Sequence, residues 1–239
     1  WANSNSSSNN DADVSSGLPV IFPELADAWI TVVNVQITGN ISNSTVARAS
    51  GPCGQTAQFC ISADGYQVTN AGFVDSGGTS QYSTVSGTSM ASPMISGAIA
   101  VLFQVFPNHT PAQIVDRILA SANNTFFTHS GNLTFDNGIF HGYNTEFGHG
   151  IPDFYAAMAP ITSNNFTRTS NRVFVEGSLS GSFSGLQDTR LMLGRTLNSQ
   201  LYNSLENEFL YFYDGLNGGF KYDFSNVINA SSKNFSINE

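Results

Sequence analysis

The chain has 239 residues, enough to bury a large core, and predicts one domain with an appendage or two small domains. Its net charge of −9 would repel phosphate backbones and anionic membrane surfaces, so we expect neither nucleic acid nor a membrane surface as a partner. Aromatic residues make up 12%, as in globular proteins, and no apolar run suggests a membrane span.

The first forty residues predict a polar loop followed by a buried strand. Residues 3–17 are mostly Asn, Ser and Asp, which is typical of an exposed loop. Asp11 and Asp13 in this loop are interpreted as solvated carboxylates; a structural calcium ion stays an alternative, but no set of ligands can be assigned. Residues 18–29 predict a surface segment. Residues 30–37 are mostly β-branched and form a mostly continuous apolar run, which indicates a buried strand of a parallel sheet.

Two cysteines, Cys53 and Cys60, lie close together in the sequence. In a chain poor in Lys and rich in Asn and Ser, this spacing favours a small disulfide loop formed in an oxidising compartment. A zinc site would need two further ligands, and a pair of buried thiols is the remaining alternative. A short extended piece is expected over residues 46–50 and a further strand over residues 59–63. A loop rich in Gly, Ser and Thr is expected over residues 66–83.

A polar turn then leads into residues 90–105, which are apolar on almost every face. Such a helix is expected in the middle of a domain, wrapped by other elements. Ser89 would lie in its first turn, where backbone N–H groups lack partners and the helix dipole favours negative charge. An ordinary N-cap serine is one interpretation. A hydroxyl beside an anion site for acyl transfer is the other.

The remainder of the chain predicts short helices, turns and a hairpin. Thr110 and Gln113 form a capping box that starts a helix over residues 111–122. The later expectations, in order, are a polar–aromatic insertion of uncertain hairpin character (123–143), a glycine turn (147–150), a short helix (153–158), a linker (162–171), an edge strand (173–183), an amphipathic helix (188–207) and a hairpin (210–213 with 220–224).

The run Gly87-Thr88-Ser89-Met90-Ala91-Ser92-Pro93 resembles the nucleophile motif of the subtilases, the subtilisin-like serine proteases. Met94 departs from the motif, which commonly has His there, and Asp64 departs from the Ala-Pro-Gly turn that the family has earlier in the chain. The resemblance covers residues 1–159. It implies an α/β fold, a parallel sheet with helices on both faces, in which residues 1–160 are the C-terminal part of the protease domain and residues 161–239 a linker and small mixed α+β extension.

The resemblance also implies catalytic roles. Ser89 would be the nucleophile, and its own N–H would be one donor to the oxyanion. The second donor in subtilases is an Asn side chain, and Trp1-Ala2-Asn3-Ser4-Asn5 resembles that place, which makes Asn5 the candidate. Because Ser4 replaces the usual Gly, the role could shift to Asn3, and an ordinary loop Asn remains an alternative. The chemistry requires no cofactor.

The other two members of the triad are expected outside this chain. In subtilases the Asp and the His precede the Ser, whereas all four histidines here follow Ser89 and are expected to be surface or turn residues. We therefore expect an upstream segment or chain that supplies Asp and His, and a polypeptide substrate. Since the chain opens at Trp1 without an initiator Met, we expect it to be a piece of a longer product.

The paired cysteines and the tail resemble those of bacterial autotransporter subtilases. This implies an extracellular or cell-surface location and an outer-membrane barrel beyond the C-terminus. Two functions fit the sequence: a secreted serine endopeptidase, or a structural or adhesive surface protein derived from a subtilase, with incidental or lost activity. The intact motif around Ser89 favours the endopeptidase.

Overall fold

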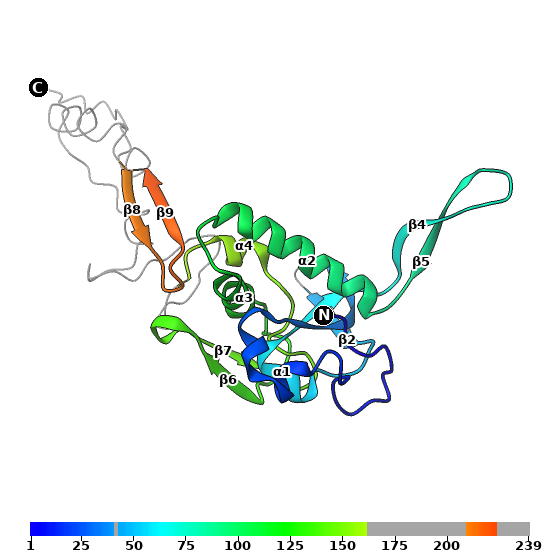
Figure 1. The fold of residues 1–239 in the computed structure, drawn as a ribbon, viewed down its shortest axis with the longest axis horizontal. Coiled ribbons are helices and arrows are strands. Elements are labelled where there is room, and N and C mark those ends of the chain that lie inside the picture. Colours follow the sequence, from blue (N-terminus) through cyan, green and yellow to red (C-terminus); the bar gives the residue numbers. More distant parts are fainter. Residues whose placement is uncertain (41–42, 162–208, 224–239) are drawn as a thin grey trace, which may run out of the picture.

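The computed structural model of the chain describes residues 1–40, 43–161 and 209–223 (Figure 1). Its helices and strands follow in the order α1 (Leu18–Ile21), the 3-10 helix η1 (Pro23–Ala28), β1 (Thr31–Asn40), β2 (Asn43–Arg48), the 3-10 helix η2 (Gly54–Phe59), β3 (Cys60–Asp64), β4 (Val68–Val74), β5 (Ser80–Val85), α2 (Thr88–Val105), α3 (Pro111–Ala120), β6 (Gly131–Thr134), the 3-10 helix η3 (Asp136–Gly138), β7 (Phe140–Tyr143), α4 (Phe154–Met158), β8 (Phe209–Tyr213) and β9 (Gly219–Asp223). This mixture confirms the predicted α/β class.

The central sheet has the strand order β2-β1-β3. β1 and β3 run parallel, with Thr31 opposite Cys60 and Val35 opposite Asp64. This pairing confirms the buried parallel strand predicted from the β-branched run, which extends three residues further than expected. Ala2 forms a parallel bridge to Val32, so the first residues of the chain lie alongside β1 as a further extended segment. β2 pairs with the far end of β1 in the antiparallel direction.

Alternate residues of β1 face two separate parts of the core, because successive side chains of a strand point to opposite faces. Val32 packs with Ile61 and with the buried stripes of α2 and α3. Val33 packs on the other face, with Ala57 of η2 and the two cysteines. Both valines are essentially inaccessible, which stabilises the fold by about 1.5–3 kcal/mol for each such side chain. In the described residues, the α-helices α2 and α3 cover one face and the 3-10 helix η2 covers the other.

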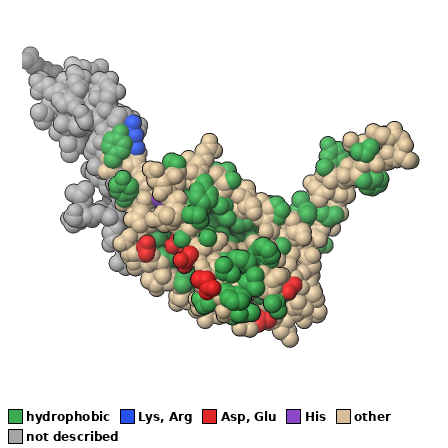
Figure 2. Space-filling model, in the orientation of Figure 1, with side chains coloured by type: hydrophobic (Ala, Val, Ile, Leu, Met, Phe, Trp, Pro, Cys, Tyr) green, Lys and Arg blue, Asp and Glu red, His purple; other side chains and the backbone are tan. Residues whose placement is uncertain are grey.

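The helix α2 begins at Thr88 and ends before Phe106 and Pro107, as the sequence predicts. Its buried residues Ala91, Ile95, Ala98 and Leu102 form one stripe toward the sheet. The prediction that other elements wrap the whole helix is wrong for the described part of the chain: Met94 is 50% exposed and Val101 49%. Figure 2 shows hydrophobic side chains gathered over this part of the surface. Among the described residues, the sheet, α3 and α4 contact α2, and the apolar side chains of Met94 and Val101 on its remaining surface stay exposed.

The length and hydropathy of α2 are also those of a helix that can cross a membrane, so the prediction that no apolar run reaches that length is wrong. Its contacts with β1 and β3 and its buried stripe are those of a core helix. We therefore treat α2 as part of the globular core.

The capping box before α3 is confirmed in both directions. The Thr110 hydroxyl accepts the N–H of Gln113, and the Gln113 side chain accepts the N–H of Thr110 at 2.9 Å. The short helix α4 is also confirmed, with Asp153 as its N-cap. The glycine turn lies directly against β3: a Cβ on Gly148, which has a positive φ of 61°, would come within 2.1 Å of the Cys60 carbonyl oxygen. Only glycine can occupy that position.

Two segments form hairpins where the sequence predicted a loop or left the structure open. The prediction of a loop over residues 66–83 is wrong, because β4 and β5 pair there in the antiparallel direction, with Thr69 opposite Thr84. This hairpin projects from the body of the molecule as an arm (Figure 1). Its Val, Thr and Tyr residues favour strands, but the glycines and serines between them hide the alternation. Residues 131–143 contain the second hairpin, β6 with β7.

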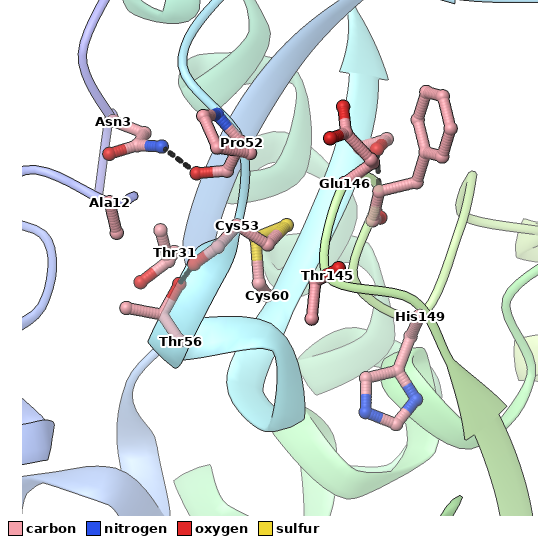
Figure 3. Close-up of a disulfide and its surroundings, with 12 residues drawn as sticks. Asn3, Ala12, Thr31, Pro52, Cys53, Thr56, Cys60, Thr145, Glu146 and His149 are labelled. Atoms are coloured by element: carbon pink, nitrogen blue, oxygen red, sulfur yellow. Dashed lines mark hydrogen bonds between the residues drawn. A yellow bond between two sulfur atoms is a disulfide. The ribbon is translucent and has the colours of Figure 1, made fainter. Parts of the chain in front are cut away.

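Cys53 and Cys60 form a disulfide, as predicted (Figure 3). The zinc and free-thiol alternatives are therefore wrong. The disulfide is buried between η2 and β3, on the face of the sheet opposite α2. It anchors the start of β3, whose first carbonyl, that of Cys60, accepts the N–H of His149 at 2.8 Å.

The predicted C-terminal hairpin is confirmed as β8 and β9, with Phe212 opposite Phe220. Leu216 in its turn is buried in the main core cluster. The linker, edge strand and amphipathic helix predicted between residues 162 and 207 lie outside the described residues. The boundary between domains near residue 160 stays a prediction.

Candidate functional site

Ser89 is the second residue of α2, and it is exposed. The carbonyl of Gly87 accepts the N–H groups of Met90 at 2.9 Å and Ala91 at 3.2 Å, which closes the first turn. Among the described residues, no hydrogen bond involves the N–H or the Oγ of Ser89. A hydroxyl thus lies beside a free N–H at the positive end of the helix dipole, where a negative charge is stabilised.

Asn5 lies against this turn. Its Oδ1 accepts the N–H of Thr88 at 2.8 Å and is 3.0 Å from the Thr88 hydroxyl. A Cβ on Gly87 would lie 3.0 Å from the same Oδ1, so glycine lets Asn5 approach closely. No described hydrogen bond involves Asn5 Nδ2. The side chain is therefore held by its oxygen, and its two amide hydrogens remain available to a ligand.

Asn3, the alternative candidate, has a different environment. It is buried, and its Oδ1 accepts the N–H of Asp13 at 2.8 Å and the hydroxyl of Ser16 at 2.8 Å. Its Nδ2 donates to the Pro52 carbonyl at 2.8 Å (Figure 3). These bonds join three parts of the chain and leave the amide no free donor on the side of Ser89. Asn3 fits a structural role, so Asn5 remains the candidate for the oxyanion.

Thr88 links the two asparagines, a contact that was not predicted from the sequence. Its hydroxyl lies 2.6 Å from the carbonyl oxygen of Asn3, and its N–H binds Asn5. The residue before Ser89 is thereby fastened to the segment beside β1. A polar residue at the first position of an apolar helix was the only sequence feature that could have pointed to this contact.

The expectation that all four histidines are surface or turn residues is wrong for His141, which lies in β7, whereas His149 lies in the predicted glycine turn but is not on the surface. His149 is fully buried and His141 is mostly buried, and their Nδ1 atoms are 3.0 Å apart. Their Nε2 atoms lie 2.9 Å from the Ala122 carbonyl and 3.0 Å from the Gln58 carbonyl. Burial lowers the pKa of His149 to about 3 and also lowers that of His141.

None of the four histidines forms a described hydrogen bond with Ser89. His129 is exposed, as expected, and His109 is partly buried, with its Nε2 3.2 Å from the Leu216 carbonyl. No described hydrogen bond joins any of the four rings to Ser89. The base of a serine nucleophile is therefore not found among these contacts.

In the N-terminal loop, hydrogen bonds tie the carboxylate of Asp11 to η2. Asp11 accepts the N–H of Gln55 at 2.8 Å and also binds its side-chain amide. Burial alone would raise the pKa of Asp11, but the hydrogen bonds from Gln55 and Ala12 outweigh it and lower the pKa. Among residues 1–40, 43–161 and 209–223, no three His, Cys, Asp or Glu side chains are grouped to hold a metal ion.

The arrangement around Ser89 has parts that can stabilise an oxyanion. It presents an exposed hydroxyl, the adjoining N–H of the same residue and a nearby amide whose oxygen is fixed. Donors of this kind stabilise negative charge that develops on an oxygen bound at the site.

Comparison with known sequences gives a family match. The model described as "Subtilase family" matches residues 1–150. The chain is 32% identical over 122 residues to the "Extracellular serine protease" of Serratia marcescens, a match that covers 44% of this chain and 11% of that protein. It is 34% identical over 103 residues to the "Extracellular serine proteinase" of Thermus sp. (strain Rt41A), which covers 41% of this chain and 23% of that protein. The chain thus spans less than a quarter of each of these two relatives.

A third relative and two solved structures are also similar. The "Serotype-specific antigen 1" of Mannheimia haemolytica is 33% identical over 107 residues, or 44% of this chain and 11% of that protein. Fervidolysin from Fervidobacterium pennivorans, described as a keratinolytic enzyme related to subtilisin, has 24% identity and a TM-score of 0.37, covering 55% of this chain and 19% of its own. The self-cleaved protease domain of PatA has 21% identity and a TM-score of 0.37, covering 55% and 40%.

Proposed function

This chain belongs to the subtilase family, and from that premise we propose that it is the part of a secreted serine endopeptidase that carries the nucleophile, Ser89. The observation that supports this role most strongly is the placement of Ser89: an exposed hydroxyl on the first turn of α2, beside an N–H that no described residue uses. The proposal also rests on the motif in which Ser89 stands.

The proposed reaction is peptide-bond hydrolysis through an acyl-enzyme. Ser89 Oγ attacks the carbonyl carbon of the substrate, and the hydroxyl proton passes to a histidine base. The N–H of Ser89 and Nδ2 of Asn5 donate hydrogen bonds to the carbonyl oxygen and stabilise its developing negative charge. The C–N bond breaks as the base gives the proton to the leaving amine. Water then attacks the acyl group by the same steps, releases the acid and restores the hydroxyl.

The base and its orienting carboxylate would come from a complementing segment or chain with a His and an Asp. Three features of the described structure support such a partner. The apolar face of α2 with Met94 and Val101 is open, and patches of this kind often mark interaction sites. The second feature is a groove of about 290 Å³ between α2 and β1, lined mainly by apolar residues that include Trp1, Ile30, Ile95, Ile99 and Phe103.

The third feature is an open sheet edge. Asn3 N–H and the Trp1 carbonyl bind Val32, which leaves the backbone groups of Ala2 without a described partner. Unpaired strand edges readily accept another strand. Peptide mapping of the native protein tests this partner: we expect a polypeptide with a His and an Asp to accompany the chain. A native sample without one contradicts the complementation.

We further propose an extracellular or cell-surface location and membership of the autotransporter type, with an outer-membrane barrel beyond the C-terminus. The buried disulfide supports an oxidising compartment. Two relatives are named extracellular and one is named an antigen. The autotransporter assignment itself rests on the resemblance of the cysteine pair and tail.

The alternative function is that of a structural or adhesive surface protein. The similarity to a protein named for its antigenicity is the observation that favours it. A fluorophosphonate probe applied to the native protein distinguishes the two functions. We expect one probe molecule per chain on Ser89, none in Ser89→Ala, and unchanged labelling in the matched control Ser92→Ala. A native, correctly folded protein that takes up no probe supports the structural role.

A further inference from the structure

Asn34 is a buried amide directly under the start of α2. It lies in the middle of β1, is 1% exposed, and shares the face of the sheet with Val32, which packs against Ala91. Its backbone is fixed separately, because Asn34 N–H donates to the Ser50 hydroxyl at 2.9 Å. The side chain is therefore presented to α2 from a rigid strand.

A chain of hydrogen bonds runs from this side chain to the turn that carries Ser89. Asn34 Oδ1 accepts the N–H of Gly65 at 2.8 Å. The carbonyl of Gly65 accepts the N–H of Gly87 at 3.0 Å. The carbonyl of Gly87 in turn accepts two N–H groups of the first turn of α2. Ser89 lies within that turn, two residues after Gly87.

Gly65, Gly87 and the first turn of α2 are closely packed against one another. A Cβ on Gly65 would come within 2.5 Å of the Gly87 carbonyl oxygen and 2.8 Å of the Ala91 nitrogen. The Gly65 N–H also lies 3.0 Å from the Ala63 carbonyl, only two residues away. Asn34 Oδ1 is thus its only described acceptor from outside the turn. A shift of Gly65 would be passed on to Gly87 because the two backbones are in contact.

The amide nitrogen of Asn34, in contrast to its oxygen, does not hold any other segment in place. Asn34 Nδ2 is buried and has no hydrogen-bond partner among the described residues. A buried donor without a partner opposes folding. An apolar side chain of similar size would avoid that cost, so the contribution of Asn34 must come from its oxygen.

We propose that Asn34 is a positioning residue for the nucleophile: by holding Gly65, and through it Gly87, its oxygen fixes the direction in which Ser89 Oγ and the Ser89 N–H point. This inference rests on the proposed function of Ser89. Asn34 does not touch the substrate, so its effect falls on the rate of the chemical step and not on binding.

The test measures the maximal rate and the half-saturating concentration for fluorophosphonate labelling of Ser89, together with the thermal unfolding midpoint. It uses the native protein with the segment that completes its triad. In Asn34→Leu we expect the maximal rate to fall on the order of tenfold, as for a small displacement of a reacting group, with the half-saturating concentration unchanged. Asn34→Asp keeps the acceptor oxygen and is expected to recover most of the rate, although a buried charge lowers its midpoint.

Ser62→Ala is the matched control. It removes a buried hydroxyl that donates to the Phe147 carbonyl at 2.9 Å and has no described hydrogen bond to Asn34 or Gly65, so we expect a lower midpoint and a wild-type labelling rate. Wild-type labelling of Asn34→Leu, or an equal loss of rate in Ser62→Ala, overturns the inference and leaves the proposed function intact. A wild-type protein that is not labelled at all overturns the proposed function and this inference with it.

Discussion

Arg117 of α3 and Asp214, in the turn between β8 and β9, form an ion pair that is fully buried. Arg117 Nη2 lies 2.8 Å and 2.6 Å from the two carboxylate oxygens. Its Nη1 donates to the Ala157 carbonyl at 3.0 Å, and the guanidinium lies 4.1 Å from the ring centre of Phe106. The carboxylate also accepts N–H groups of its own turn, including that of Gly218 at 2.7 Å. The pair therefore fastens the C-terminal hairpin to the core.

Breaking this pair from one side should strongly destabilise the chain. Asp214→Ala leaves a buried guanidinium without its counter-ion, and we expect the free energy of unfolding to fall by about 3–5 kcal/mol. Glu146→Gln is the control, since it weakens the partly exposed pair of Glu146 with Arg48 and leaves the bonds of Arg48 to backbone carbonyls in place, and it should cost about 0–1 kcal/mol. Urea unfolding measures both. Equal losses in the free energy of unfolding for the two substitutions would show that the buried pair stabilises the fold no more than the partly exposed one.

Substitution of Asn5 should lower the activity, whereas substitution of Asn3 should lower the stability. Asn5→Ala is expected to lower kcat by roughly 10²–10³-fold, the range known for the corresponding donor of subtilisin itself, with little change in unfolding. Asn3→Ala removes several buried hydrogen bonds and should lower the free energy of unfolding by about 2–3 kcal/mol. Asn9→Ala, in the same loop, controls for loop changes. A loss of kcat in Asn3→Ala without destabilisation would move the oxyanion role to Asn3.

The sequence sufficed for elements whose local chemistry decides their structure. The β-branched run of β1, the capping box at Thr110 and the closely spaced cysteines each carry their own signal, and each was confirmed. The hairpin of β4 and β5 was missed because its apolar residues are sparse among Gly and Ser. The burial of His141 and His149 was missed for a different reason, since it depends on residues 58 and 122, which are distant in the sequence.

The same distinction holds for the site. The motif around Ser89 is contiguous, so the nucleophile candidate could be read directly from the sequence. The links through Thr88, Asn34 and Gly65 join segments more than twenty residues apart, and no local pattern predicts them. The choice between Asn3 and Asn5 likewise needed the packing of both side chains.

The two buried histidines should make the chain labile to acid. Burial lowers the pKa of His149 to about 3 from 6.5, so below pH 6.5 the unfolded chain binds more protons than the folded one. Stability is fully present above that pH and falls as the pH drops toward 3, by at most about 1.4 kcal/mol per pH unit for one proton.

Urea unfolding at a series of pH values between 7.5 and 4.5 measures this loss. His149→Phe should flatten the decline, whereas His129→Ala, an exposed histidine, should leave the slope unchanged. The same slope in wild type and His149→Phe would exclude the buried pair as its source.

Asp116 should have the opposite pH dependence. Burial, together with Asp136 and Asp27, raises its pKa to about 6 from 3.8. Its ionisation therefore favours the unfolded chain, and stability is lost as the pH rises from about 4 through 6. Because the side chain is only partly buried, we expect Asp116→Asn to gain about 1 kcal/mol at pH 8. The gain should disappear at pH 4. A gain that is the same at both pH values would show that charge is not its cause.

The most direct measurement of the central claim is the mass of the protein during turnover. The native protein is mixed with an activated ester, and the reaction is quenched in acid within the first turnover. The protein is then digested, and the mass of the peptide that contains Ser89 is measured by mass spectrometry. We predict one acyl group on Ser89 per chain, and none in Ser89→Ala. An ester hydrolysed with no acyl group on Ser89, or with the group on another residue, would contradict the assignment of Ser89 as the nucleophile.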